Sequence, residues 1–161
     1  MKYNDGKADE LKTTFWNALA SSPYLFLQLD NDPHSAVPMN PQLDKDANSS
    51  IWFYTHKDAD FAKLGDATAT FQGKGHEVYA RFHGTLTEET SRERFEQFWD
   101  NFVEAWYEGG KDDPNLLFLR MDLGTAEIWD SDLGVMTTAK MAMGKTVIDE
   151  QEKQHVDRAQ L

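Results

Sequence analysis

The sequence predicts a mainly β protein of the α+β class, built as an antiparallel barrel with peripheral helices. About six or seven segments have strand character, and two or three have helical character. These segments do not alternate regularly between strand and helix, which argues against a doubly wound parallel sheet. No internal repeat and no long Gly/Ser/Pro linker divides the 161 residues. We therefore expect one domain over residues 1–145 and a polar tail over residues 146–161.

Charge and composition exclude several classes of function. The chain has 16 basic and 28 acidic residues, a formal net charge of −12, and no cluster of Lys and Arg that would neutralise phosphates. We therefore expect no nucleic-acid partner. No apolar stretch is long enough for a membrane span or a signal peptide, so no membrane association is expected. The absence of cysteine excludes disulfides, thiol chemistry and cysteine-ligated metals, and it favours a cytoplasmic location.

The first predicted element is a helix over residues 9–20. Leu11, Phe15, Ala18 and Leu19 recur at helical spacing, and Pro23 stops the pattern. Beyond Pro23 the hydrophobic period changes to the period of strands.

Two strands are predicted next. Residues 24–29 form a nearly continuous apolar run, which is typical of a strand buried on both faces. Residues 35–43 are predicted as the following strand. Because Pro38 and Pro41 cannot donate to a ladder, this strand should lie at a sheet edge or carry a bulge. Residues 44–50 are then a surface loop.

The middle of the chain has the clearest strand periodicity. A short aromatic strand is predicted over residues 51–55, followed by a brief helix over residues 59–64. Residues 67–72 alternate small apolar and polar side chains, and residues 73–75 indicate a hairpin turn. The longest strand follows, and its predicted inner face consists of Val78, Ala80, Phe82, Gly84 and Leu86.

An aromatic helix is predicted after this longest strand. Thr90 and Glu93 have the spacing of a capping box. The stripe behind them recurs at helical spacing and is formed by Phe95, Phe98, Trp99, Phe102 and Trp106. We expect the stripe to pack against the core and the helix to end at Gly109-Gly110.

The last part of the chain carries a second predicted hairpin. Residues 116–121 and 126–129 are its expected strands, with a turn at Gly124. Residues 133–143 are predicted as a Met-rich helix or loop, and residues 145–161 as a polar segment with little to bury.

Most familiar catalytic and metal-binding motifs are missing. There is no Walker A sequence, no nucleophile elbow and no pair of histidines at helical ligand spacing. His83 and the pair Asp112-Asp113 are candidate acid–base groups, but each is explained more simply as a hydrogen-bonded or solvated residue. We therefore assign no catalytic residue and no metal site.

One local sequence combines an aromatic strand with groups that bind anions. The strand ends in Thr55, His56 and Lys57, which offer a hydroxyl, an imidazole and an ammonium group to a phosphate. Because the net charge is −12, a phosphate site needs local positive charge. Besides Lys57, the candidate sources of this charge are Lys63 and Arg81. The alternative is an ordinary strand end with solvated side chains.

Some aromatic side chains are placed where a planar ligand could stack, because they lie at strand or helix ends next to turn residues. They are Trp52, Tyr54, Trp106 and Trp129. Packing within the fold is the alternative for each of them.

These features together resemble the general stress protein branch of the pyridoxamine 5′-phosphate oxidase-like proteins, which have the FMN-binding split-barrel fold. The most specific match is the Trp-aromatic-x-Gly-Gly-Lys-Asp-Asp-Pro stretch of residues 106–114. The other matches are residues 15–16, 38–39 with Gln42, 51–58, 84–86 and 126–129. The resemblance extends to about residue 145. It implies a six-stranded split barrel that forms a homodimer, with one FMN in each of two symmetric clefts at the interface.

The resemblance also implies roles for individual residues. Residues 37–42 would form the strand that runs beside the isoalloxazine ring, with Met39 and Gln42 as contacts. Trp129 is at the position where relatives place a tryptophan near the flavin of the partner subunit. Trp106 would close the cleft.

The phosphate and ribityl chain of the flavin are assigned to the end of the aromatic strand. By resemblance, Thr55 and Lys57 would hold them, with His56 or Tyr54 nearby.

One residue departs from the family pattern. Many relatives carry an arginine where this chain has Val37. A missing charge-assisted bond costs about 1.5–3 kcal/mol, or roughly ten- to a hundredfold in affinity. Substrate-binding basic residues of true pyridoxamine 5′-phosphate oxidases have no match in residues 130–145, so vitamin B6 oxidation is not expected.

Three functions are compatible with these observations. The leading hypothesis is an FMN-binding, general stress-type protein that acts as a flavin-dependent oxidoreductase. The second is a non-enzymatic protein that binds flavin or another planar cofactor for sensing or storage. The third is a barrel without cofactor that serves as an interaction scaffold.

Overall fold

A computed structural model describes residues 8–46, 49–131, 142–143 and 154–161. Its helical elements are α1 (Ala8–Ser21), α2 (Arg92–Phe98), α3 (Asn101–Glu104) and two 3₁₀ turns, η1 (Asp60–Lys63) and η2 (Gly110–Asp112). Its strands are β1 (Leu25–Leu29), β2 (Asp32–Met39), β3 (Gln42–Leu43), β4 (Ser50–His56), β5 (Gly65–Gln72), β6 (Val78–Glu88), β7 (Leu116–Asp130) and β8 (Gln154–Gln160). The predicted mainly β class is confirmed.

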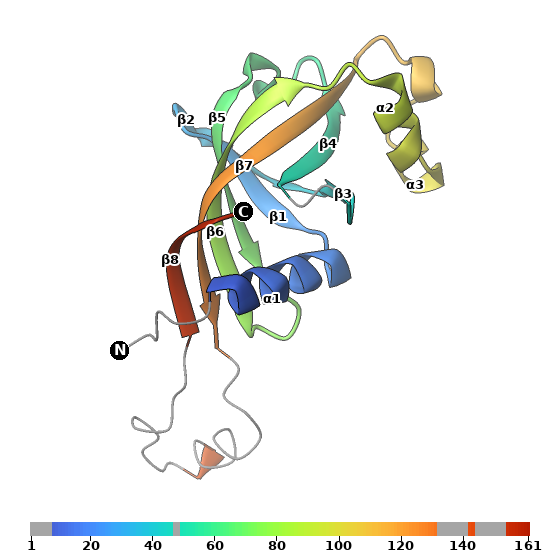
Figure 1. Cartoon of the computed structure of the whole chain (residues 1–161). Helices are drawn as coiled ribbons and strands as arrows, with labels where there is room; N and C mark the ends of the chain where they lie inside the picture. Colours follow the sequence, from blue (N-terminus) through green and yellow to red (C-terminus); the bar gives the residue numbers. More distant parts are fainter. Residues whose placement is uncertain (1–7, 47–48, 132–141, 144–153) are drawn as a thin grey trace.

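All strands belong to one antiparallel sheet, which curves strongly in Figure 1. The strand order is β2-β1-β5-β6-β7-β4-β3, and β8 adds to β7. The expected six strands correspond to β1, β2 and β4 to β7. The structure adds the two-residue strand β3 and the C-terminal strand β8.

The two ends of this strand order are joined by a very short piece of chain. β2 ends at Met39 and β3 begins at Gln42, so only Asn40 and Pro41 separate them. Since three extended peptide units span at most roughly 11 Å, the sheet must curve until its first and last strands nearly meet. The sheet is therefore a split barrel, closed by the chain rather than by a full ladder.

The proline-containing segment is an edge, as the sequence predicts, but it is divided between two edges. β2 pairs with β1, whereas β3 pairs with β4. The ladder between β1 and β2 is irregular near Leu29. There the Leu29 amide donates to Ser35 Oγ at 2.8 Å, and Ser35 Oγ donates to the Asp32 carbonyl at 2.6 Å. The side chain of Ser35 thus replaces part of the missing ladder.

The prediction that residues 24–29 are buried on both faces is wrong. Leu25, Leu27 and Leu29 are buried, but Phe26 is 54% exposed. In the described structure no helix covers the outer face of the sheet at β1, so alternate side chains meet solvent. An apolar run can indicate burial of one face only, because the sequence does not say what covers the other.

The core lies inside the curved sheet and is closed at one end by α1. Of the predicted stripe, Leu11, Phe15 and Leu19 are fully buried, and Ala18 is half-buried against the same core. The ring of Phe15 meets Phe71 and Phe82 edge-on, with centroids 5.9 and 5.3 Å apart. The predicted inner face of residues 78–86 is buried apart from the half-exposed glycine, so the alternation along β6 is confirmed.

The predicted hairpin at Gly124 is wrong. β7 is one strand of 15 residues that passes through this position. Phe82 and Gly84 of β6 pair with Ala126 and Leu123 of β7, so β7 carries one extra residue there. The extra residue forms a bulge, which bends a strand without reversing it. Glycine is compatible with both outcomes.

The predicted continuous aromatic helix is also wrong, because it is interrupted after α2. Trp99 is extended, and the Asp100 side chain caps α3 by accepting from the amides of Phe102 and Val103, both at 2.9 Å. Phe102 and Trp106 are 83% and 80% exposed rather than packed. A capping aspartate inside an aromatic stripe starts a new helix in a new direction.

The start of α2 differs slightly from the predicted capping box. The N-cap is Ser91, which accepts from the Arg94 amide at 3.1 Å, and not Thr90. Glu89, outside the helix, accepts from the Ser91 amide at 2.9 Å. The buried residues under this helix form a second aromatic cluster, on the outer face of β4 and β7, made of Trp52, Phe95 and Phe118.

The C-terminal segment is only partly a polar tail. Residues 154–160 form β8 on the edge of β7, and Val156, Ala159 and Leu161 are buried. The expectation that residues 145–161 bury little is wrong for this last part. The predicted segment 133–143 lies outside the described residues except for 142–143, and so does the domain limit at residue 145. No helix among the described residues is long and apolar enough to span a membrane.

The close approach at Gly84 gives a test of this bulged region. A Cβ there would lie 2.5 Å from the Asp122 carbonyl oxygen. We expect Gly84→Ala to lower the free energy of unfolding by about 1–3 kcal/mol, measured by urea denaturation. A Cβ at Gly124 would lie 3.5 Å from its nearest neighbour, the His83 carbonyl oxygen. Gly124→Ala should therefore change the free energy of unfolding by less than about 1 kcal/mol. Equal effects would contradict this packing.

Candidate functional site

The two faces of β4 separate the residues predicted to bind phosphate. Ile51 and Phe53 face the main core, whereas Trp52 belongs to the aromatic cluster under α2. By the same alternation, Thr55 lies on the core side, and Tyr54 and His56 lie on the side of the aromatic cluster. The predicted group of four is therefore not one cluster in a single chain.

Thr55 has an unsatisfied hydroxyl at the end of the strand. It is 8% exposed, and no described residue makes a hydrogen bond to its side chain. The other buried polar residues differ: Ser35 contacts backbone groups of β1 and β2, and Ser50 donates to Asp122 Oδ1 at 2.8 Å. An unsatisfied buried polar group costs about 1–3 kcal/mol. Thr55 is thus available to a ligand or a bound water.

Lys57 is the cation nearest to Thr55 in the sequence and is exposed. Its side chain forms no ion pair with any described residue. The other two candidate cations are neutralised, because Lys63 pairs with Asp60 at 3.0 Å and Arg81 with Glu127 at 2.8 Å. The local positive charge expected at the strand end is therefore supplied by Lys57.

Tyr54 is held by the aromatic cluster. Its hydroxyl donates to the Phe95 carbonyl at 2.6 Å, and its ring stacks on Phe118 with centroids 4.6 Å apart. Burial, together with the charges of Asp100 and Glu96, raises the pKa of Tyr54. The side chain in this position anchors α2 to β4.

The family-specific stretch of residues 106–114 packs against the end of β4. The buried ring of Tyr107 lies 4.8 Å from the ring of His56, centroid to centroid. The Lys57 amide donates to the Asn115 carbonyl at 2.8 Å, and the Asn115 side-chain nitrogen lies 3.2 Å from His56 Nδ1. Burial, then the charge of Asp113, raises the pKa of Tyr107 to about 12. This contact fixes the backbone that carries Thr55 and Lys57.

Asp113 organises the same stretch internally. Its two carboxylate oxygens accept from the amides of Asn115 at 2.8 Å and Gly109 at 3.1 Å. These backbone hydrogen bonds lower the pKa of Asp113. Asp113, considered in the sequence as an acid–base candidate, therefore has a structural role. Sequence reasoning did not single out Asn115; the Asp-Asp-Pro-Asn composition of the turn is the signal that marks it.

The residues assigned to the flavin ring lie at the closing junction of the barrel. Gln42 pairs with Trp52, three residues before Thr55 on β4. Met39 ends β2 and packs against the main core. Val37 is 41% exposed on the same edge strand. The junction thus brings the ring-binding segment next to the strand that carries Thr55.

Trp106 and Trp129 lie at different ends of the fold. Trp106 is exposed and directly precedes Tyr107, which contacts the end of β4. Thr55 pairs with Leu117 on β7, and Trp129 follows twelve residues further along this strand, which corresponds to roughly 40 Å. Within one chain, Trp129 cannot contact a ligand that binds Thr55.

His83 forms a separate polar group on the outer face of the sheet. Its Nδ1 lies 2.9 Å from Thr68 Oγ1, which donates to Asp30 Oδ1 at 2.6 Å. His83 and Asp30 line a depression of about 360 Å³, together with Asp66 and Asp122. Among the described residues, no group of three or more acidic or histidine side chains is arranged to hold a metal ion. His83 therefore remains a hydrogen-bonded sheet residue.

A curved antiparallel sheet whose two edge strands are joined across two residues has the architecture of a split barrel. The chain belongs to the family described as pyridoxamine 5′-phosphate oxidase like, whose model matches residues 10–154. The resemblance inferred from the sequence is thereby confirmed.

The similar solved structures belong to the same class. The general stress FMN/FAD binding protein from the phytopathogen Xanthomonas citri is 40% identical, covers 75% of this chain and 89% of its own, and has a TM-score of 0.68. A general stress protein 26 from Jannaschia sp. CCS1 is 30% identical over 92% and 98% of the two chains, with a TM-score of 0.75. No curated protein matches the chain.

The structural role of Asp113 predicts a pH-dependent effect on stability. A carboxylate with a lowered pKa stabilises the fold above its unfolded pKa, and this contribution is lost as the pH falls through the lowered value. We expect Asp113→Ala to lower the free energy of unfolding at pH 7 and to do so progressively less below about pH 4. Urea denaturation at several pH values measures the difference. Asp112→Ala is the control and should have little effect at any pH; equal losses would contradict the assignment.

Proposed function

We propose that this protein binds FMN, with the phosphate at Thr55 and Lys57. The buried Thr55 hydroxyl, which no described residue satisfies, carries the proposal. A phosphate oxygen would accept a hydrogen bond from this hydroxyl. The ammonium group of Lys57, which pairs with no described residue, would neutralise the charge of the phosphate. The printed description of the 40% identical Xanthomonas citri protein as FMN/FAD binding supports the same ligand class.

We further propose that the complete site forms between two copies of the chain. Trp129 lies roughly 40 Å along β7 from the strand position that pairs with Thr55. Only a second copy can bring such a tryptophan to a flavin that is bound at Thr55. Met39, Gln42 and Trp106 would come from the same chain as Thr55, and Trp129 from the other.

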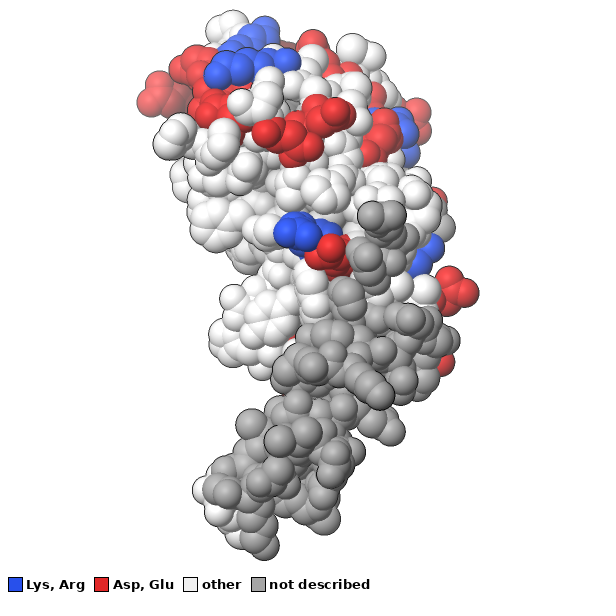
Figure 2. Space-filling view, turned by 90° about the vertical axis from the view of Figure 1, so that its left-hand side faces the viewer, with Lys and Arg blue, Asp and Glu red and all other residues white. Residues whose placement is uncertain are grey.

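The outer face of the sheet offers the surface for this dimer. Tyr24 and Phe26 are 64% and 54% exposed, and Pro38 is exposed opposite Phe26. Figure 2 shows uncharged surface over the middle of one side of the molecule, with one small group of basic and acidic residues in it and many charged residues above it. Exposed apolar patches of this kind mark protein interfaces.

Bound FMN would supply a ring that exchanges hydride or electrons, so we propose a flavin-dependent oxidoreductase. Residues of this chain would bind the phosphate, orient the ring along residues 37–42 and exclude water between the copies. None is assigned as a general acid or base. The lack of cysteine favours activity in a reducing cytoplasm.

Val37 favours a second candidate function, a flavin-binding protein without turnover. The side chain is apolar and 41% exposed at the strand position where the family resemblance implies an arginine. A weaker site would suit exchange of the flavin for sensing or storage. Oxidation of a reduced nicotinamide by the flavin-loaded protein separates the functions, because only the oxidoreductase consumes it catalytically.

The phosphate assignment is tested by titration of the apoprotein with FMN, followed by flavin fluorescence. We expect binding in the micromolar range and much weaker binding of riboflavin. Thr55→Val and Lys57→Ala should each weaken FMN binding about tenfold or more. Thr55→Val should not destabilise the apoprotein, because it removes an unsatisfied hydroxyl. Lys74→Ala, in the exposed hairpin turn, is the charge-matched control. No binding at about 100 μM would overturn the flavin proposal and favour a scaffold.

The dimer assignment is tested at Phe26. A carboxylate buried in an apolar interface is strongly unfavourable, so Phe26→Asp should convert a dimer into a monomer in light scattering and weaken FMN binding. Phe102→Asp alters an aromatic residue on α3 that is still more exposed, 83% against 54% for Phe26, and should leave the dimer intact. A dimer that survives Phe26→Asp would place the interface elsewhere.

A further inference from the structure

A second cavity lies at the other end of β4 from Thr55. It measures about 450 Å³ and is bounded by α1, by Ser49 just before β4, and by the end of β8. Six residues separate Ser49 from Thr55, which corresponds to roughly 20 Å along an extended strand. The cavity is therefore separate from the proposed phosphate site, and the inference drawn from it does not depend on the proposed function.

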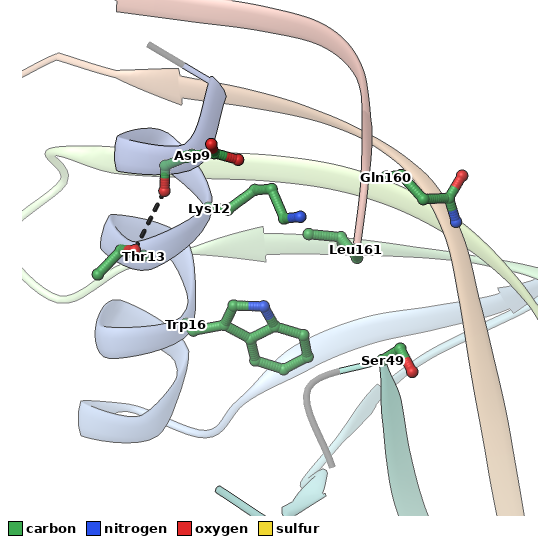
Figure 3. A pocket seen from close by; sticks show the side chains of 7 residues that line it. All are labelled: Asp9, Lys12, Thr13, Trp16, Ser49, Gln160 and Leu161. Atoms are coloured by element: carbon green, nitrogen blue, oxygen red, sulfur yellow. Dashed lines mark hydrogen bonds between the residues drawn. The ribbon is translucent and has the colours of Figure 1, made fainter. Parts of the chain in front are cut away.

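The walls of this cavity come from elements far apart in the sequence. Figure 3 shows Lys12 and Trp16 projecting from α1 toward Leu161 and Ser49. The Leu161 amide donates to the Gly124 carbonyl at 3.1 Å, which holds this wall against the bulge of β7. A cavity of this size is within the range of small-molecule sites, about 300–1,000 Å³.

Trp16 provides an apolar surface for a flat ligand group. Its ring packs against Phe15, with centroids 5.2 Å apart and planes at 59°, and the indole remains partly exposed toward the cavity. Lys12 and Trp16 are four residues apart on α1, so they lie on the same helix face. A ligand that contacts one can therefore contact both.

The cavity is lined by one positive and one negative side chain that form no ion pair with any described residue. They are the half-buried Lys12 and the exposed Asp9. Asp9 and Lys12 are three residues apart, which places their Cβ atoms about 5–6 Å from each other. The charges of Lys12 and Asp9 therefore cancel in sum, and a positive and a negative group lie close to each other in the cavity wall.

We propose that this cavity binds a free α-amino acid with an aromatic side chain. The ligand carboxylate pairs with Lys12, its ammonium group pairs with Asp9, and its ring packs on Trp16. Ser49 and Gln160 add a hydroxyl and an amide on the facing walls. A simple anion would face the Asp9 carboxylate and a simple cation would face Lys12, so a zwitterion matches the lining better than either.

Calorimetric titration of the full-length protein with L-phenylalanine tests the proposal. We expect saturable binding at millimolar or lower concentrations, with 3-phenylpropionate and phenethylamine at least about tenfold weaker, since each lacks one charged group. Absence of saturable binding up to about 10 mM would overturn the proposal. Equal binding of 3-phenylpropionate would overturn the zwitterion assignment.

Variants locate the binding and separate it from the flavin site. Lys12→Met and Asp9→Asn should each weaken L-phenylalanine binding about tenfold or more, whereas Lys74→Met, on the exposed turn, should leave it unchanged. Circular dichroism verifies that α1 is retained. Thr55→Val, or saturation with FMN, should not alter the affinity. Binding that persists in both charge variants, or that FMN abolishes, would contradict this site.

Discussion

Closure of the sheet across Asn40 and Pro41 is the constraint on which the rest of the structure depends. These two residues join β2, at one end of the strand order, to β3, at the other. The short connection forces the sheet to curve around one core, which α1 then covers at an open end. It also places Gln42 beside Trp52 of β4, three residues after Met39. The same constraint that closes the core therefore brings the proposed ring-binding and phosphate-binding segments together.

β4 combines several roles because its side chains alternate. Ile51 and Phe53 pack in the core of the barrel. Trp52 and Tyr54 contact α2 on the outer face of the sheet. At the strand end, His56 packs on Tyr107, and the buried Thr55 hydroxyl has no hydrogen-bond partner among the described residues. The turn around Asp113 supports the same end through Asn115 and Tyr107. Rigid support around a free polar group is the arrangement that ligand binding needs.

Sequence reasoning succeeded where local pattern and burial agree. The alternation from Val78 to Leu86, the stripe on α1 and the prolines at a sheet edge all follow from side-chain periodicity and backbone chemistry. It failed where two local structures share one signal. Gly124, in an apolar run, is compatible with a turn or with a bulge, and pairing with β6 makes it part of a bulge. The aromatic stripe through Phe102 is compatible with one helix or with two, and the Asp100 cap starts a second helix.

The sequence by itself determined the class of the fold, its edges, most of its core and the family to which the chain belongs, because these depend on hydrophobic period and local motifs. Only the tertiary structure decided which predicted site residues can share a ligand. It separated Thr55 from Tyr54 and His56 by strand alternation, and it placed Trp129 far along β7. It also revealed the cavity at Trp16, whose walls are joined only by folding. Proximity between distant segments depends on how the sheet curves, and no local pattern encodes that curvature.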